Sequence, residues 1–258
     1  MAVNKIVFGS NVLIDLTADT VTADKLSEGI TAHDKSGNKI TGTMTSSGSS
    51  QVKEPYIEET YDVSGNLIDA RLYGYDKIRA YAFYSCSKLA LTSLPSGITS
   101  IGAYVFYSCR MLALTSLPSG ITGIGTSAFY NCSKLTLTSL PSGITSIGNN
   151  AFYNCGNLAL TSLPSGITSI GSSAFYSCSK LALTSLPSGI TSIGSSAFYN
   201  CTSLTSLTFE GKPTTINSRA FKNCSKLRVI NVPWAEGAVA NAPWGATNAT
   251  INYNYTGE

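Results

Sequence analysis

The sequence "CSKLALTSLPSGITSIGSSAFYN", residues 178–200, is one period of a repeat from which the fold of most of the chain can be predicted. Cys201 follows Cys178 by 23 residues, and Cys155 precedes it by the same interval. A sequence period of about 20 to 50 residues indicates a solenoid, because one unit cannot bury its apolar side alone and stacked units align equivalent residues into ladders. All seven cysteines of the chain share this register: Cys86, Cys109, Cys132, Cys155, Cys178, Cys201 and Cys224.

Each unit contains two short runs of β-forming residues and one turn segment. The run "LALTSL" ends at Pro187, and proline marks the limit of a strand because it cannot donate a ladder hydrogen bond. The run "GITSI" ends at Gly194, where glycine, or Asn217 in the following unit, predicts a turn with positive φ. The same prediction applies to Gly102, Gly125, Gly148 and Gly171. The segment "SSAFYNC" predicts one helical or 3₁₀ turn that leads into the next unit.

The unit resembles the leucine-rich repeat of the BspA type, whose pattern is C-x-x-L-x-x-V-x-I-P-x-x-V-x-x-I-G-x-x-A-F. The resemblance covers about residues 63–235. It implies a β-rich solenoid of the α+β class, a right-handed coil with a parallel sheet on one side and short helical turns, used for binding and not for catalysis. The matching positions in the last two units are Cys201, Leu204, Leu207, Phe209, Ile216, Ala220, Phe221, Cys224, Leu227, Ile230, Val232 and Pro233.

Five units depart from this pattern by carrying threonine at an apolar position and an additional leucine just before it. Because strand side chains alternate, this leucine and the one three residues later share a face only if the strand bulges between them. The alternatives are a bulge that buries the additional leucines and an exposed leucine stripe, and the bulge is favoured because monomers seldom expose such a row. The residues concerned are Leu91, Leu114, Leu137, Leu160 and Leu183.

We expect three parts in the chain. Residues 1–42 form a small β module, with a strand in "KIVFGSNVLIDL", a short helical turn capped by Thr22, and a hairpin near His33. Residues 43–52, rich in serine and glycine, form a flexible linker. Residues 53–258 form the capped solenoid: an N-terminal cap over 53–82, repeats over 83–232, and a C-terminal cap over 233–258, where two tryptophans and the strand-like "TINYNY" cover the last layer.

The string "DLTADTVTADKLSEGITAHDKSGNKITGTM", within residues 12–44, resembles a segment of tail and fibre proteins from bacteriophages and prophages of Firmicutes. The resemblance implies attachment to other tail proteins through residues 1–42, a location in the virion tail or in the cytoplasm of the producing cell, and a homo-trimer. No secretory signal is recognised at the N-terminus. A location on a bacterial cell surface is the alternative.

The composition argues against several classes of protein. Only 12% of residues are charged, and the net charge of +3 is too small to indicate a nucleic-acid partner. The sequence contains no run of eighteen apolar residues, so no membrane-spanning helix is predicted. The single histidine, His33, is interpreted as an exposed turn residue, and no grouping of residues predicts a catalytic site, a metal site or a cofactor.

The cysteines could form disulfides, bind a metal or pack in the core. Equivalent residues of adjacent coils lie about 5 Å apart, so pairing is geometrically allowed. An odd number of cysteines and the absence of C-x-x-C spacing argue against disulfides and zinc. We therefore expect a ladder of small buried apolar side chains.

Two columns of outward residues are the candidate binding residues. The tyrosine after each repeat phenylalanine is expected to face outward, giving a column about 25 Å long. These rings could contact a protein or a glycan, or they could stack on one another and shield the coil. The tyrosines are Tyr84, Tyr107, Tyr130, Tyr153, Tyr176 and Tyr199, and the second column contains Ser93, Ser116, Ser139, Ser162 and Ser185.

From these features we expect a non-enzymatic binding protein, a phage or prophage tail-fibre component that recognises a host-surface glycan or protein through repeated contacts. A bacterial surface adhesin and a passive structural spacer are the alternatives.

Overall fold

A computed structural model describes residues 5–8, 11–15, 31–33, 39–41 and 55–257. The chain divides into two compact units, residues 1–54 and 55–258. The described part of the first unit is two antiparallel hairpins, β1 (Lys5–Phe8) with β2 (Asn11–Asp15) and β3 (Thr31–His33) with β4 (Lys39–Thr41).

The hairpins of the first unit correct two predictions. The run "KIVFGSNVLIDL" forms a hairpin and not a single strand, because residues 5–8 pair back onto residues 11–15. His33 lies in strand β3, paired with Lys39, and not in the turn. The helical turn predicted after Thr22 and the linker over 43–52 lie outside the described residues.

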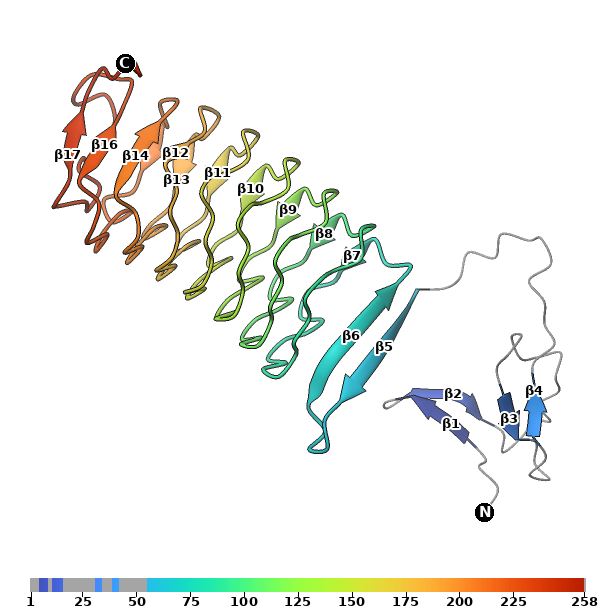
Figure 1. Cartoon of the computed structure of the whole chain (residues 1–258). Coiled ribbons are helices and arrows are strands. Elements are labelled where there is room, and N and C mark those ends of the chain that lie inside the picture. The colour runs from blue at the N-terminus through green and yellow to red at the C-terminus, as the bar shows by residue number, and fades with distance from the viewer. Residues whose placement is uncertain (1–4, 9–10, 16–30, 34–38, 42–54, 258) are drawn as a thin grey trace. The chain divides into compact units, whose positions relative to one another are not determined.

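The second unit is a solenoid held together by a seven-stranded parallel sheet (Figure 1). Each coil contributes two residues of its "GITSI" run, and each strand pairs in register with the residues 23 positions away, such as Ser146 with Ser169. The strands are β7 (Lys77–Ile78), β8 (Ser100–Ile101), β9 (Gly123–Ile124), β10 (Ser146–Ile147), β11 (Ser169–Ile170), β13 (Ser192–Ile193) and β15 (Thr215–Ile216). The isoleucines point inward and their preceding residues outward, as expected for strands.

The first run of each unit, "LALTSL", was predicted to be a strand, and in most coils this prediction is wrong. A second parallel sheet forms only towards the C-terminus, from β12 (Ser185–Leu186), β14 (Ser206–Phe209), β16 (Val229–Asn231) and β17 (Thr250–Asn252). In earlier coils a hydrogen bond such as that from Ala159 N to Leu137 O, at 3.1 Å, joins neighbours in place of a ladder.

The additional leucines are buried, but no strand bulge is needed to bury them. Leu160 is fully buried, and Leu163, three residues later, is 7% exposed. Both point inward because the segment between them is not a regular strand, so its side chains do not alternate strictly between two faces. The five leucines therefore widen the core and leave no exposed stripe.

The segment predicted as a helical turn is a series of tight turns, and no helix occurs among the described residues. Asn150 and Asn154 adopt positive φ, at 54° and 57°. Between them, alternate amides bond within the turn and to the next coil: Tyr153 N donates to Asn150 O at 3.1 Å, whereas Phe152 N donates to Ala174 O at 2.8 Å. In a helix, every backbone amide would bond within the same segment. The tight turns leave alternate amides free to bond to the next coil, and these hydrogen bonds join neighbouring coils.

The glycine after the sheet strand does not have the predicted positive φ, either at Gly171 or at its equivalents. A Cβ atom on Gly171 would lie 2.6 Å from Asn149 N and 2.7 Å from Gly148 C. Glycine is therefore required because backbones of adjacent coils approach closely here, and not because of a left-handed turn.

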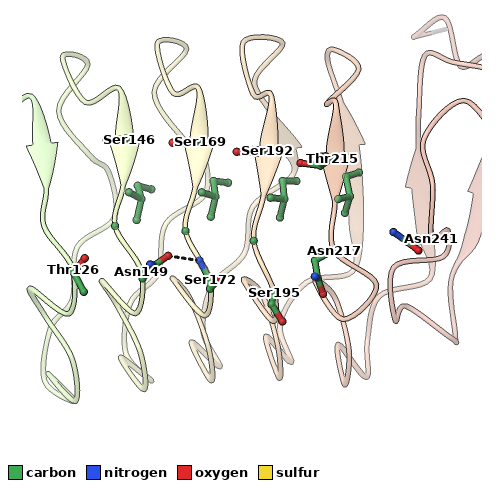
Figure 2. A pocket seen from close by; sticks show the side chains of 17 residues that line it. Thr126, Ser146, Asn149, Ser169, Ser172, Ser192, Ser195, Thr215, Asn217 and Asn241 are labelled. Atoms are coloured by element: carbon green, nitrogen blue, oxygen red, sulfur yellow. Dashed lines mark hydrogen bonds between the residues drawn. The ribbon is translucent and has the colours of Figure 1, made fainter.

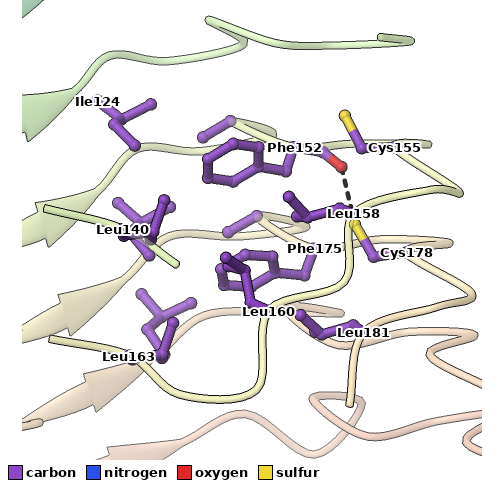
Figure 3. Packing of buried hydrophobic residues seen from close by; sticks show 14 of the residues in the cluster. Ile124, Leu140, Phe152, Cys155, Leu158, Leu160, Leu163, Phe175, Cys178 and Leu181 are labelled. Atoms are coloured by element: carbon purple, nitrogen blue, oxygen red, sulfur yellow. Dashed lines mark hydrogen bonds between the residues drawn. The ribbon is translucent and has the colours of Figure 1, made fainter. Parts of the chain in front are cut away.

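Buried side chains form continuous ladders inside the solenoid (Figure 3). Phenylalanine rings of neighbouring coils stack with centroids 5.2–5.5 Å apart. Each fully buried phenylalanine contributes about 1.5–3 kcal/mol. The cysteine Sγ donates to the phenylalanine carbonyl of the preceding coil, as from Cys178 to Phe152 at 3.0 Å. All seven cysteines are free, six are buried and Cys86 is half-buried, as the core-ladder interpretation predicts.

Both ends of the solenoid are covered. At the N-terminal end, β5 (Tyr56–Tyr61) and β6 (Leu67–Tyr73) form an antiparallel hairpin, and Ala90 N donates to Ile68 O across to the first coil. At the C-terminal end, Trp244 is fully buried and its Nε1 donates to Ala240 O at 2.8 Å. Trp234 packs edge-on against Phe209, so both tryptophans act as core residues.

Among the described residues there is no helix long and apolar enough to cross a membrane.

A hydroxyl-lined groove and a tyrosine column

A groove of about 720 Å³ lies along the outer face of the seven-stranded sheet (Figure 2). Two rows of small polar side chains line it, one on the strands and one just after the glycines. The strand row is Ser146, Ser169, Ser192 and Thr215, and the second row is Thr126, Asn149, Ser172 and Ser195, with Asn217 and Asn241 at the C-terminal end.

The strand row arises from the alternation of side chains within each strand. Ile170 points into the core, so Ser169 before it must point out of the sheet. Because Ser169 pairs in register with Ser192 on β13, the hydroxyls repeat once per coil, about 4.8 Å apart. Small side chains in both rows keep the groove open.

The groove has donors and acceptors but no charge. None of the residues that line it is acidic or basic. The Asn149 side-chain oxygen accepts a hydrogen bond from Ser172 N at 2.8 Å. This bond between adjacent coils holds the Asn149 side-chain amide in place. A repeated array of hydroxyls and amides is suited to hydrogen bonding with a neutral polar ligand, and the in-register coils would present the same contacts repeatedly.

The tyrosine column forms one continuous stack on another part of the coil. Ring centroids of successive tyrosines lie 4.5–4.8 Å apart, with interplanar angles of at most 10°. The four interior rings therefore have both faces covered by neighbours. Tyr84, at the N-terminal end of the column, is 46% exposed, and Asn223 donates to the Tyr199 hydroxyl at 2.8 Å. The column offers a ligand ring edges and hydroxyls, and few free ring faces.

Burial raises the pKa of the Tyr130, Tyr153 and Tyr176 hydroxyls, and a neighbouring tyrosine of the column raises it further because two adjacent phenolates would repel. The hydroxyls therefore stay protonated at physiological pH and can both donate and accept hydrogen bonds.

The predicted serine column lies outside the groove. Ser116, Ser139 and Ser162 are exposed on the "LTSLP" segment, and Ser185 is half-buried in β12. Ser93 lines a smaller groove of about 410 Å³ beside strand β6. The predicted serine column therefore does not contribute to the groove on the seven-stranded sheet.

The buried thiols are chemically inert. Burial raises the pKa of Cys155 to about 12, so almost no thiolate forms at neutral pH. Among the described residues, no group of three or more histidine, cysteine, aspartate or glutamate side chains could hold a metal ion.

The groove residues are not among the binding residues predicted from the sequence. The signal was present, because the serine in "ITSI" precedes an inward isoleucine in coil after coil. The predicted serine column lies on the other run of each unit, "LALTSL".

Comparison with known sequences agrees with this architecture. The BspA type leucine rich repeat region, in six copies, matches residues 76–182 and 145–237. The chain belongs to the BspA-type leucine-rich repeat family. No curated protein sequence matches it significantly.

Solved structures of leucine-rich repeat proteins have the same fold as the BspA-type solenoid described above. The T. pallidum leucine-rich repeat protein TpLRR is 27% identical, with a TM-score of 0.52, over 66% of this chain and 87% of that one. The pneumococcal vaccine antigen PcpA is 22% identical, with a TM-score of 0.53, over 72% of this chain and 46% of its own length. The second comparison supports the fold alone.

Proposed function

We propose that this protein is a non-enzymatic binding protein whose solenoid recognises a neutral glycan on a host-cell surface. One observation carries the proposal: the uncharged groove that runs across β10, β11, β13 and β15 and repeats its hydroxyls once per coil. An extended oligosaccharide advances by about the spacing of one coil per sugar, so successive sugars would meet equivalent side chains. Individually weak hydrogen bonds to successive sugars would then combine into stronger binding of the whole oligosaccharide.

The proposal includes a place in a phage or prophage tail fibre. It is supported by the resemblance of residues 12–44 to segments of tail and fibre proteins of Firmicutes phages. In this arrangement residues 1–42 attach to other tail proteins, the solenoid is distal, and trimer formation would multiply the number of grooves. The location would be the virion tail, or the cytoplasm before assembly.

A bacterial surface adhesin is the second candidate. Membership of the BspA-type leucine-rich repeat family favours it, because this is the role usually inferred for the repeat. In both candidates the solenoid binds and catalyses nothing, and the groove is the proposed contact surface. They differ in what residues 1–42 attach to.

The test is binding of the full chain to an array of neutral cell-wall and capsular oligosaccharides. The double variant S169Q/S192Q places longer neutral side chains in the middle of the groove. We expect this variant to have at least about tenfold lower affinity for the glycan that the unmodified chain binds. The longer side chains would make the groove shallower and remove two hydroxyls from it.

The matched control is S116Q/S139Q, which makes the same change at exposed serines outside the groove. It should bind like the unmodified chain. A third variant, Y130A/Y153A, reports on the tyrosine column. Unchanged binding by S169Q/S192Q, or failure of the full chain to bind any neutral glycan, would contradict the proposal.

A further inference from the structure

A separate column of lysines runs along the turns that follow the cysteines. Lys88, Lys134, Lys180 and Lys226 are 46 residues apart, so they occupy the same position in every second coil. The intervening coils have uncharged residues there, namely Met111, Asn157 and Ser203. We name the four lysines the lysine column.

The coils beside the lysine column are stacked in register, so the sequence spacing becomes a fixed distance. One residue before the column, Ser133 Oγ donates to Arg110 O at 3.3 Å, and Ser179 Oγ donates to Gly156 O at 3.2 Å, each across 23 residues. With about 4.8 Å per coil, lysines of the column attach to the backbone about 10 Å apart over roughly 29 Å in total.

The lysine column is exposed and almost free of acidic groups. All four lysines are exposed, and none forms an ion pair with a described residue. The sequence has no acidic residue between Cys86 and Phe209. Asp62 lies near Lys88 and has its pKa lowered chiefly by hydrogen bonds from Asn66, with a small contribution from Lys88. Lys134 and Lys180 lie within the stretch of sequence that has no acidic residue.

From this spacing we infer that the lysine column is a second binding site, for a linear glycan that carries one acidic group on every second sugar. An extended glycan advances by about one coil per sugar, so its acidic groups would recur about every two coils and each would meet one lysine. The uncharged sugars between them would lie over the uncharged positions. Each contact is weak at physiological salt, and four in register make the binding multivalent.

Charge density argues against nucleic acid as the ligand of this site. Duplex DNA carries one negative charge for about every 1.7 Å of its axis, whereas the column offers one cation for about every 10 Å. Arg110 adds one cation beside the column, and Arg219, Lys222 and Arg228 add three near its C-terminal end. This site is independent of the neutral groove proposed above.

The test measures binding of the full chain to three probes of about eight sugars, a length that gives hyaluronan four carboxylates for the four lysines. The probes are a hyaluronan oligosaccharide, which has one carboxylate per disaccharide, a neutral chito-oligosaccharide, and a densely sulfated heparin fragment. We expect hyaluronan to bind more tightly than the chito-oligosaccharide. The variant K88Q/K134Q/K180Q/K226Q should lose at least about tenfold in affinity for hyaluronan.

The control variant R71Q/K77Q/R79Q/K212Q removes the same net charge at exposed positions outside the column. It should retain most of the affinity for hyaluronan. Equal losses in both variants, absence of hyaluronan binding at physiological salt, or stronger charge-driven binding of heparin with no dependence on the column would overturn the inference. Binding of neutral glycans to the groove is measured separately with S169Q/S192Q, so each proposal can fail alone.

Discussion

At the scale of single residues, the glycine of each unit shows how tightly the coils stack. The five glycines at this position, Gly102 to Gly194, look like turn residues in the sequence, yet none has positive φ. Gly123 belongs to another column, on strand β9, where a Cβ atom would meet nothing within 4 Å. The two kinds of glycine therefore have opposite tolerance for a side chain.

We expect G171A to lower the free energy of unfolding by about 1–3 kcal/mol, because its Cβ would press on backbone atoms of Asn149 and Gly148 that cannot move aside without separating two coils. Urea denaturation followed by circular dichroism measures the change. G123A is the control, with an expected change within about 0.5 kcal/mol of zero. Equal destabilisation by both variants would show that close approach is not what requires Gly171.

At the scale of elements, the caps decide whether the open ends of the coil are protected. The N-terminal cap supplies β6, whose Ala70 and Leu72 are buried against the first coil. The C-terminal cap uses Trp244 and Trp234 to cover Phe209 in place of another repeat. Without such covering, the last layer would expose apolar rings and unpaired strand edges.

We expect W244A to cost about 3–5 kcal/mol, because it removes a fully buried ring that packs on Phe209 and Trp234. Urea denaturation and light scattering would measure lost stability and association through the uncovered end. W244F retains most of the packing and loses the hydrogen bond to Ala240, so it should cost less than W244A. A W244A protein as stable as the unmodified chain would show that the cap does not protect this end.

At the scale of the whole solenoid, each coil contacts mainly its two neighbours, so coil number can change without loss of the fold. Deletion of residues 155–177 joins Asn154 to Cys178 and recreates the junction found at Asn131 and Cys132. We expect the shortened chain to fold with a similar circular dichroism spectrum. It loses Ser169 and Ser172 and with them one coil of the groove, so long neutral glycans should bind more weakly while short ones are less affected.

Deletion of residues 155–166 removes about half of a unit and is the control for this experiment. It places residues of unlike position next to each other in the stack, and we expect it to unfold the solenoid. Retention of a cooperative melting transition by the half-unit deletion, or its loss from the full-unit deletion, would contradict the nearest-neighbour description of stability.

The strict 23-residue spacing of Phe152, Cys155 and Leu158 is enough to predict the solenoid, because stacking is the only way to bury one face of every unit. It also predicted the buried thiols, since equivalent cysteines must share one environment in each coil. These properties depend on which residues are apolar and how often they recur, and the sequence states both directly.

The identity of the main sheet, the need for the glycines and the position of the groove could not be predicted from the sequence. Each of these depends on contacts between coils: the register of Ser169 with Ser192, the distance from Gly171 to the backbone of Asn149, and the alternation of amides near Asn154. A single unit has no partner for these hydrogen bonds and no neighbour to approach. The local sequence favours turns and strands within one unit. In the folded solenoid the hydrogen bonds are made mostly between coils, so the local preference is not always followed.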